Sequence, residues 1–179
     1  MTKITTALLQ LALLGGVLLC AGCKTAPSQP ALQPVAKVEL PRFMGDWYVI
    51  AHIPTFIEKG AYNAVESYRL SPDGTIATTF TFNRDAPDGP VKTYTPKGFV
   101  RDSSNAEWGM QFVWPIKAEY KIVYLDPEYQ HTIVARDQRD YVWIMARTPH
   151  IAESDYQALT ERVRLMGYET NLLRRVPHK

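Results

Sequence analysis

Short segments of alternating apolar and polar residues fill the chain between residues 45 and 147, and they constrain the fold more than any other feature. Alternation with a period of two is typical of β-strands, and many short strands at regular spacing indicate an all-β barrel or sandwich. Turn-forming stretches such as Ser71-Pro72-Asp73-Gly74 separate the segments, so consecutive strands are expected to pair with each other. Eight antiparallel strands are predicted, at residues 45–53, 62–70, 75–83, 92–101, 106–114, 118–126, 130–136 and 141–147.

After the last strand the apolar residues recur with a period of about 3.6, which predicts one amphipathic helix packed on the outside of the sheet. Ser154 opens a capping-box pattern, and Gly167 stands where a helix end favours a positive φ. The residues expected on the apolar face are Tyr156, Leu159, Val163 and Met166. Residues 171–176 are expected to add a short strand.

The first 22 residues have the composition of a secretory signal peptide, with Lys3 followed by an apolar run from Ala7 to Leu19. This run is shorter than the roughly 20 residues that span a hydrocarbon core. Ala21-Gly22-Cys23 resembles the lipobox of bacterial lipoproteins, in which the cysteine is lipidated and becomes the new N-terminus; an ordinary cleavage site is the alternative. The chain has two cysteines, Cys20 and Cys23, so no disulfide is expected in the exported domain.

Residues 24–37 are rich in proline and small polar residues and show no periodicity, which predicts a flexible linker. In an extended state it would hold the domain roughly 40 Å from a membrane. The expected organisation is a signal peptide at 1–22, a lipidated Cys23 with its linker at 23–38, and one domain at 39–179. The net charge of +2, without a basic stripe, argues against a nucleic-acid partner.

Gly45-Asp46-Trp47 opens the first strand, and Arg147 follows the last one. A guanidinium can stack on an indole face while it donates to nearby carbonyls, which would join the first strand to the last. With the stretches at 43–51, 120–129 and 140–149, these residues resemble the three conserved blocks of the lipocalin family, in its bacterial outer-membrane branch related to apolipoprotein D. The second block keeps only Asp126 and Tyr129 of the pattern in vertebrate members.

The resemblance implies an eight-stranded up-and-down barrel with one outer helix, anchored by lipid to an outer membrane and facing the periplasm. Lys24, rather than an aspartate, follows the cysteine, and by resemblance to lipoprotein sorting in enteric bacteria this favours the outer membrane. It further implies that the barrel binds, stores or transports hydrophobic small molecules, such as fatty acids or lysophospholipids. Gly45, Trp47 and Arg147 would be structural residues at the closed end, whereas Tyr120 and Trp143 match positions near the ligand.

Strand parity selects the residues that face the barrel interior. Outward Glu119 and Lys121 turn Tyr120, Ile122 and Tyr124 inward, and the same logic places Trp108, Met110, Phe112, Tyr141, Trp143 and Met145 inside. In the second strand, Ala64, Glu66, Tyr68 and Leu70 share one face, and the parity that buries Tyr68 and Leu70 also buries Glu66. Each aromatic residue alone is more often plain core than a ligand contact, and only the barrel context favours the ligand. The predicted ligand-binding residues are Tyr120, Trp143, Phe112, Met110, Tyr141, Glu66 and Tyr68.

Two features stay open at the level of the sequence. A buried Glu66 requires a polar partner or a raised pKa, and it meets either a ligand head group or an interior tyrosine or arginine, unless a bulge turns it outward. In the long connection from residue 54 to residue 61, Phe56 and Ile57 either cross the barrel mouth or pack in an ordinary loop.

Enzyme chemistry has little support in the sequence. The four histidines lack metal-ligand spacing, no cysteine remains as a nucleophile, and no Gly-x-Ser-x-Gly motif occurs, so neither a metal nor a cofactor is expected. The alternative function is a lipocalin-fold enzyme that uses Glu66 on a lipid or an isoprenoid. A third reading is an envelope interaction module whose interior is filled by side chains.

Overall fold

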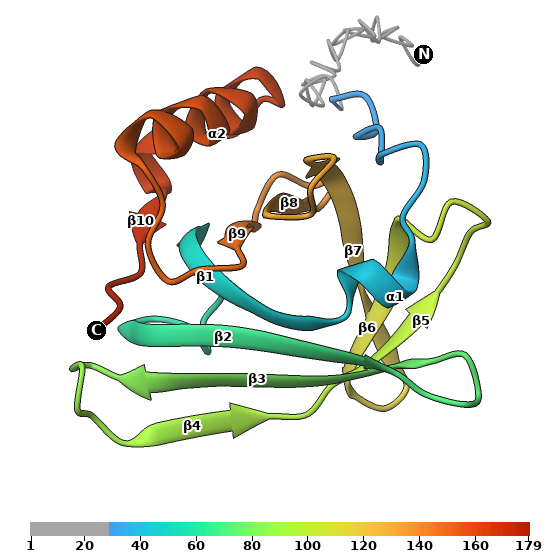
Figure 1. Cartoon of the computed structure of the whole chain (residues 1–179), viewed down its shortest axis with the longest axis horizontal. Coiled ribbons are helices and arrows are strands. Elements are labelled where there is room, and N and C mark those ends of the chain that lie inside the picture. The colour runs from blue at the N-terminus through green and yellow to red at the C-terminus, as the bar shows by residue number, and fades with distance from the viewer. Residues whose placement is uncertain (1–28) are drawn as a thin grey trace, which may run out of the picture.

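The computed structural model describes residues 29–179, and the predicted signal peptide and Cys23 lie outside the described residues. Antiparallel strands form one sheet that closes on itself, because β1 pairs with both β2 and β9 (Figure 1). The barrel strands are β1 (Gly45–Ile53), β2 (Ala61–Leu70), β3 (Ile76–Arg84), β4 (Val91–Tyr94), β5 (Lys97–Val100), β6 (Glu107–Val113), β7 (Ile116–Leu125), β8 (His131–Ala135) and β9 (Val142–Ala146). The predicted eight-stranded barrel is therefore confirmed.

The fourth predicted strand is divided into β4 and β5, which both pair with β3. Thr95 and Pro96 interrupt it, since proline has no N–H to donate to a neighbouring strand. The other elements are α1 (Leu40–Phe43), α2 (Glu153–Leu165), a 3-10 turn η1 (Thr170–Leu172) and β10 (Arg174–Arg175), which pairs with β1.

Helix α2 packs on the outside of the barrel, as predicted, and buries Leu159 and Val163. It begins one residue before Ser154, and no side chain caps its first turn, so the predicted capping box is wrong. Gly167 beyond its C-terminus has the expected positive φ of +89°. A second apolar core therefore lies between α2 and the barrel wall.

Four β-bulges change the parity of the strands. They lie in β1 between Val49 and Ala51, in β2 between Tyr62 and Val65, in β6 between Met110 and Val113, and in β7 between Ile122 and Tyr124. Each bulge adds one residue to its strand and turns the side chains beyond it to the opposite face.

One consequence of the β7 bulge is that Tyr124 points out toward α2, where the guanidinium of Arg162 lies 4.3 Å from its ring. The prediction that Tyr124 faces inward is therefore wrong. The expectation that Leu70 is buried is also wrong, because this residue ends β2 at the hairpin and is 40% exposed.

The closed end of the barrel is filled by an aromatic core and covered by α1. Arg147 lies 3.8 Å over the ring of Trp47 and donates hydrogen bonds to the carbonyls of Asp46, Arg42 and Tyr129. Gly45 adopts a φ of +93°, a conformation that side chains disfavour, and this lets the chain turn from α1 into β1 beside Arg147. The contact joins the start of β1 to the residue that follows β9.

Residues 30–38 lie along the barrel wall rather than forming a free linker. The amide of Val35 donates to the carbonyl of Ile122 over 2.9 Å, and the amide of Val38 donates to Ser104 over 2.8 Å. Leu32 and Val38 are buried, in the outer and the inner core respectively. The prediction of a flexible linker is therefore corrected over this stretch, because its apolar residues find partners on the barrel.

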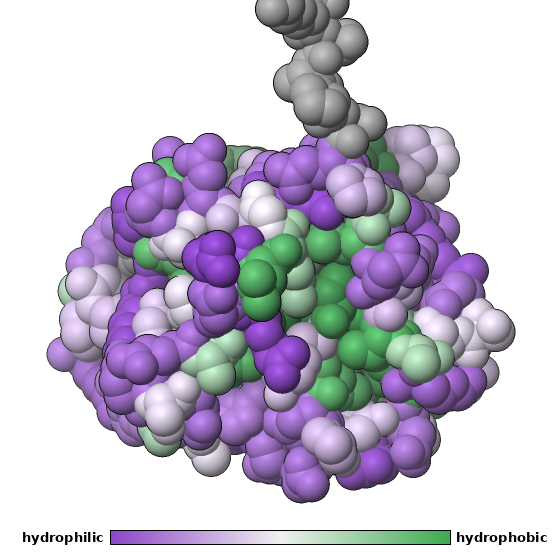
Figure 2. All heavy atoms as spheres, turned by 90° about the horizontal axis from the view of Figure 1, so that it is seen from above, coloured by the Kyte–Doolittle hydropathy of each residue, from purple (hydrophilic) through white to green (hydrophobic). Residues whose placement is uncertain are grey.

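Figure 2 shows the face that carries α2 and the N-terminal segment at the top of Figure 1. Its surface is mostly polar, with apolar residues gathered in a central area that polar residues frame. Among residues 29–179, none of the helices has the length and apolar character needed to cross a membrane.

Candidate ligand-binding cavity

A cavity of about 630 Å³ occupies the open half of the barrel. Because neighbouring strands run antiparallel, the β1–β2, β3–β4, β6–β7 and β8–β9 connections all lie at this end. The cavity lies within the size range of small-molecule pockets, roughly 300–1,000 Å³. Six of the seven predicted ligand-binding residues line it: Glu66, Met110, Phe112, Tyr120, Tyr141 and Trp143.

The seventh residue, Tyr68, is buried behind the cavity floor and does not line it. Phe112 lines the cavity near the mouth but is half exposed, so it belongs to the rim rather than to the interior. The reading that side chains fill the interior is wrong, because the open half of the barrel is hollow.

Glu66 faces the cavity from β2, while the protein surrounds it on its other sides. The bulge in β2 lies upstream, where Asn63 takes a φ of 50°, so it does not turn Glu66 outward. The hydroxyl of Tyr68 donates to the Glu66 carboxylate and lies 2.8 Å from the hydroxyl of Tyr120. A short chain of polar groups therefore runs from β2 to β7 across the floor.

Burial raises the pKa of Glu66 to about 7, against the hydrogen bond from Tyr68, and the negative charge of Glu58 adds to the increase. Burial and the nearby Glu66 also raise the pKa values of Tyr68 and Tyr120 well above the ordinary value. Near neutral pH the floor therefore exchanges one proton at Glu66, while both tyrosines remain neutral donors.

The floor is rigid because aromatic rings support it from below. The ring of Tyr120 stacks on Trp108 with centroids 4.9 Å apart, and Tyr68 meets the same indole edge-on at 5.6 Å. Trp108 is fully buried and donates from Nε1 to the carbonyl of Asn105. These contacts hold the two tyrosine hydroxyls in place and close the barrel beneath them.

A second polar cluster surrounds Glu58 in the β1–β2 loop, at the mouth. Its carboxylate accepts hydrogen bonds from Trp143 Nε1 (2.7 Å), from Thr55 N (2.9 Å) and from Thr55 Oγ1 (2.6 Å). His52 Nδ1 lies 3.6 Å away. Burial alone would raise the pKa of Glu58, but the hydrogen bonds and the attraction of His52 hold it below the ordinary value.

The β1–β2 loop lies at the mouth as one of the two predicted arrangements requires. Phe56 and Ile57 both line the cavity, and Phe56 projects with 83% of its surface exposed. The buried Glu58 between this loop and β9 fixes the position of the loop.

Thr78 adds an unpaired hydroxyl to the cavity wall. It lies on β3 opposite Tyr68, and its Oγ1 has no hydrogen-bond partner among residues 29–179. A buried hydroxyl of this kind is normally satisfied, so a ligand atom or a water molecule is the expected partner.

The pattern of the whole domain identifies its family. A family model described as a lipocalin-like domain matches residues 38–178. This chain is a lipocalin. Temperature-induced lipocalin-1 of Arabidopsis thaliana is 30% identical over 158 residues, which cover 82% of each chain. Outer membrane lipoprotein Blc of Citrobacter freundii is 30% identical over 156 residues, which cover 87% of this chain and 88% of the relative.

Among solved structures, insecticyanin of the tobacco hornworm Manduca sexta shares the fold of this lipocalin. The TM-score is 0.66 at 11% sequence identity, and the match covers 84% of this chain and 86% of insecticyanin. At this identity the likeness concerns the fold alone.

Sequence reasoning missed Glu58, His52 and Thr78 in this lipocalin. The Thr55-x-x-Glu58 spacing carried a signal, because it is the capping-box pattern in which a carboxylate returns to a preceding amide. His52 faces the mouth cluster because the bulge in β1 reverses its parity. Within the described residues, no three His, Cys, Asp or Glu side chains gather in a group that could hold a metal ion.

Proposed function

We propose that this lipocalin binds, stores or transports one hydrophobic small molecule with an acyl chain, a fatty acid or a lysophospholipid. The carrying observation is the hollow, mostly apolar cavity with a polar group at its floor. Burying some 300 Å² of acyl chain contributes about 7 kcal/mol before the costs of association, at about 25 cal/mol per Å². Binding is therefore reversible burial that needs no chemical step.

The polar end of the ligand is proposed to meet the floor at Glu66. A protonated Glu66 donates to an anionic head, and the hydroxyl of Thr78 offers a further donor. Trp143, Met110, Phe112 and Tyr141 would then contact the acyl chain along the walls. Tyr120 would contact the ligand at the floor, and Tyr68 would hold Glu66 from behind.

The proposed location is the periplasmic face of an outer membrane, with lipidated Cys23 as the anchor. The lipobox-like Ala21-Gly22-Cys23 and the similarity to proteins named outer membrane lipoproteins support this proposal. Acyl chains on the cysteine supply more than one membrane signal, which stable anchoring requires.

Native mass spectrometry of the purified mature protein tests ligand binding, and a co-purifying lipid is the expected result. Titration with a lysophospholipid should quench tryptophan emission in the parent and lose most of that effect in Trp143→Phe. A parent protein that carries no lipid and shows no quenching with either lipid class contradicts the proposal.

A second candidate function is an enzyme that acts on a lipid or isoprenoid held in the cavity. One observation supports it: the pKa of Glu66 near 7 suits a general acid or base at physiological pH. Turnover of a bound lipid that Glu66→Gln abolishes would favour the enzyme, whereas unchanged lipid after long incubation favours the carrier.

A further inference from the structure

Large apolar side chains gather on the rim of the cavity mouth, where they face solvent. We call Phe56, Phe112, Val113, Trp114 and Ile116 the rim surface. Phe56 belongs to the β1–β2 loop, and the other four belong to the β6–β7 hairpin. They make up five of the nine large hydrophobic residues that are exposed among residues 29–179, and Trp114 exposes 82% of its surface. Exposed apolar residues concentrated in this way mark an interaction site.

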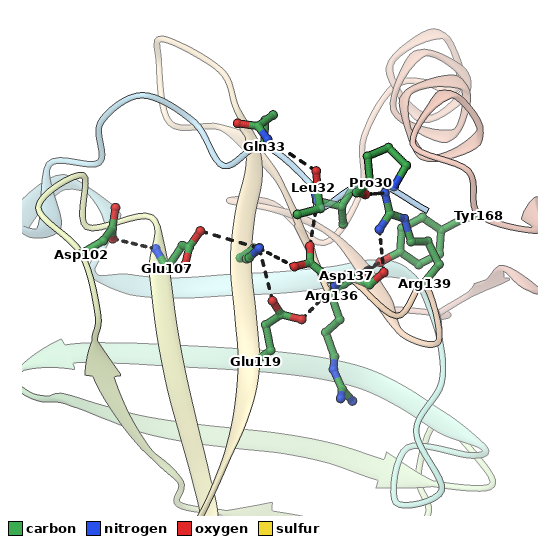
Figure 3. Close-up of polar contacts among 12 residues, drawn as sticks. Pro30, Leu32, Gln33, Asp102, Glu107, Glu119, Arg136, Asp137, Arg139 and Tyr168 are labelled. Carbon is green, nitrogen blue, oxygen red and sulfur yellow. Dashed lines mark hydrogen bonds and ion pairs between the residues drawn. The ribbon is translucent and has the colours of Figure 1, made fainter. Parts of the chain in front are cut away.

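The N-terminal segment is fastened to a loop of the same mouth (Figure 3). The carbonyl of Pro30 accepts a hydrogen bond of 2.7 Å from Arg139, and the amide of Leu32 donates to Asp137 over 2.8 Å. Arg139 and Asp137 lie in the β8–β9 loop, whose end residues Arg136 and Tyr141 line the cavity. The chain therefore reaches the barrel at its open end.

A cluster of charged side chains around the buried Lys121 holds Asp137 in place beneath this contact. Lys121 Nζ lies 2.7 Å from Asp137, 3.3 Å from Glu119 and 3.7 Å from Glu107. Glu119 also accepts a hydrogen bond from the amide of Asp137. Because Lys121 is buried and satisfied by several carboxylates, the docking point of the segment is a fixed part of the barrel.

The length of chain beyond this docking point is short. Five residues lie between Cys23 and Gln29. Even fully extended, the six residue steps from Gln29 to Cys23 reach at most about 20 Å, at 3.3–3.6 Å per residue. An anchor at Cys23 therefore lies closer to the mouth than the roughly 40 Å expected for a free linker.

We propose that the rim surface lies against the lipid bilayer, so that the mouth opens into the membrane to which the chain is tethered. Trp114 suits this position, because tryptophan prefers the interface between apolar and polar regions of a bilayer. Lys59 and Lys117 stand next to the rim surface in the two loops and are exposed, where they meet anionic head groups. Ligands then pass between the cavity and the bilayer without crossing water.

This inference rests on the proposed lipidation of Cys23 and deepens the proposed function by naming the ligand source as the bilayer. The test uses the full chain, processed in its own envelope, purified, and reconstituted into vesicles of phosphatidylethanolamine and phosphatidylglycerol. The vesicle lipids carry bromine on their acyl chains, which quenches nearby tryptophan. The difference in emission between the parent and Trp114→Phe isolates Trp114 from Trp143, which a brominated lipid inside the cavity also quenches.

Trp114 is expected to lose most of its emission in brominated vesicles and to shift to shorter wavelength in unbrominated ones. A matched variant, Trp114→Phe with Leu70→Trp, places the reporter at the exposed end of β2 on the closed side. This reporter is expected to keep its emission. A quenched Leu70→Trp reporter with an unquenched Trp114 reverses the orientation and overturns the inference.

Unquenched Trp114 in an anchored protein also overturns it, whether the mouth faces water or a second copy covers it, and cross-linking identifies the second copy. The mass of the mature N-terminus separates this result from failure of the anchor. If Cys23 carries no acyl chain, the same quenching is measured on protein added to vesicles from outside, and it still decides whether the rim surface enters the bilayer.

Discussion

The indole Nε1 of Trp143 donates a hydrogen bond of 2.7 Å to the carboxylate of Glu58, which joins β9 to the β1–β2 loop at the mouth of the cavity. Trp143 therefore serves both as part of the cavity wall and as the contact that holds the β1–β2 loop. A ligand that displaces Trp143 also loosens the loop. Access to the cavity and its occupancy are coupled through this bond.

Replacing Glu58 with alanine is expected to free the β1–β2 loop, because Thr55 and Trp143 lose their shared acceptor. Donors left unpaired in this way cost about 1–3 kcal/mol each when they remain buried. Faster amide exchange at residues 55–60 and faster ligand release measure the effect. Lys59→Ala, in the same loop but exposed, is the control, and equal exchange rates in both variants contradict the role of Glu58.

The low pKa of Glu58 predicts a pH effect with a defined sign. A carboxyl whose folded pKa lies below its unfolded value stabilises the folded state above that unfolded value, 4.5. This stability is lost as the pH falls through the folded pKa. Acid should therefore open the β1–β2 loop in the parent, with amide exchange as the readout, and a pH-independent loop would contradict the assignment.

The raised pKa of Glu66 predicts a dependence of stability on pH with the opposite sign. Its pKa is raised from 4.5 to about 7, so the folded state holds the proton more tightly than the unfolded state. The contribution to stability is full below pH 4.5 and falls by about 3 kcal/mol as the pH rises to about 7. Urea unfolding of Glu66→Gln should lack this decline, while the exposed control Glu169→Gln should retain it.

Fatty-acid affinity should follow the same titration if the anionic head meets Glu66. If only protonated Glu66 binds the anionic head group, the affinity of the parent falls about tenfold between about pH 6 and about pH 8. Glu66→Gln should bind with little dependence on pH over this range. Isothermal titration calorimetry measures it, and a parallel decline in both proteins would place the head group elsewhere.

Arg147→Lys is expected to destabilise the barrel without changing the cavity. Lysine keeps the charge but loses the planar fork that bonds three carbonyls while stacking on Trp47. A loss of about 2 kcal/mol in urea unfolding is expected from the broken hydrogen bonds and the weaker stacking. Ligand affinity below the unfolding transition should stay at the parent value, since Arg147 lies at the other end; a weakened affinity would contradict this separation.

Leu32→Ala tests whether the N-terminal segment is part of the domain. Leu32 is buried in the outer core, so truncation should cost about 2 kcal/mol or more. Ala31→Ser, at an exposed neighbour, should have little effect. Equal stability of the two variants would show that the N-terminal segment behaves as a flexible linker.

The sequence predicted the barrel because its pattern repeats in every strand, and a one-residue error in a strand end does not change the closure. Parity also placed Glu66, Tyr120 and Trp143 correctly, because no bulge lies between them and the outward residues that set the phase. It failed at Tyr124, where the β7 bulge inserts one residue. A bulge depends on backbone pairing with the neighbouring strand, which the alternation of side chains does not record.

The contacts at the mouth and those of the N-terminal segment could not be predicted from the sequence pattern, for another reason. Glu58 and Trp143 form a hydrogen bond although they are 85 residues apart in the sequence. Proline and small residues made residues 30–38 resemble a linker, yet Leu32 and Val38 are apolar positions that the barrel covers. Contacts between distant segments decide such cases, and a single local window contains only one of the partners.

The stacked pair of Trp108 and Tyr120 makes the barrel a cup with one opening. A bound ligand therefore leaves by the route through which it entered, and the barrel itself imposes no direction on its movement. If the proposed lipid ligand binds here, the concentration of free lipid at the opening sets the direction of net transfer. A protein built in this way would also serve as a buffer for that ligand, filling when free lipid accumulates and emptying when it becomes scarce.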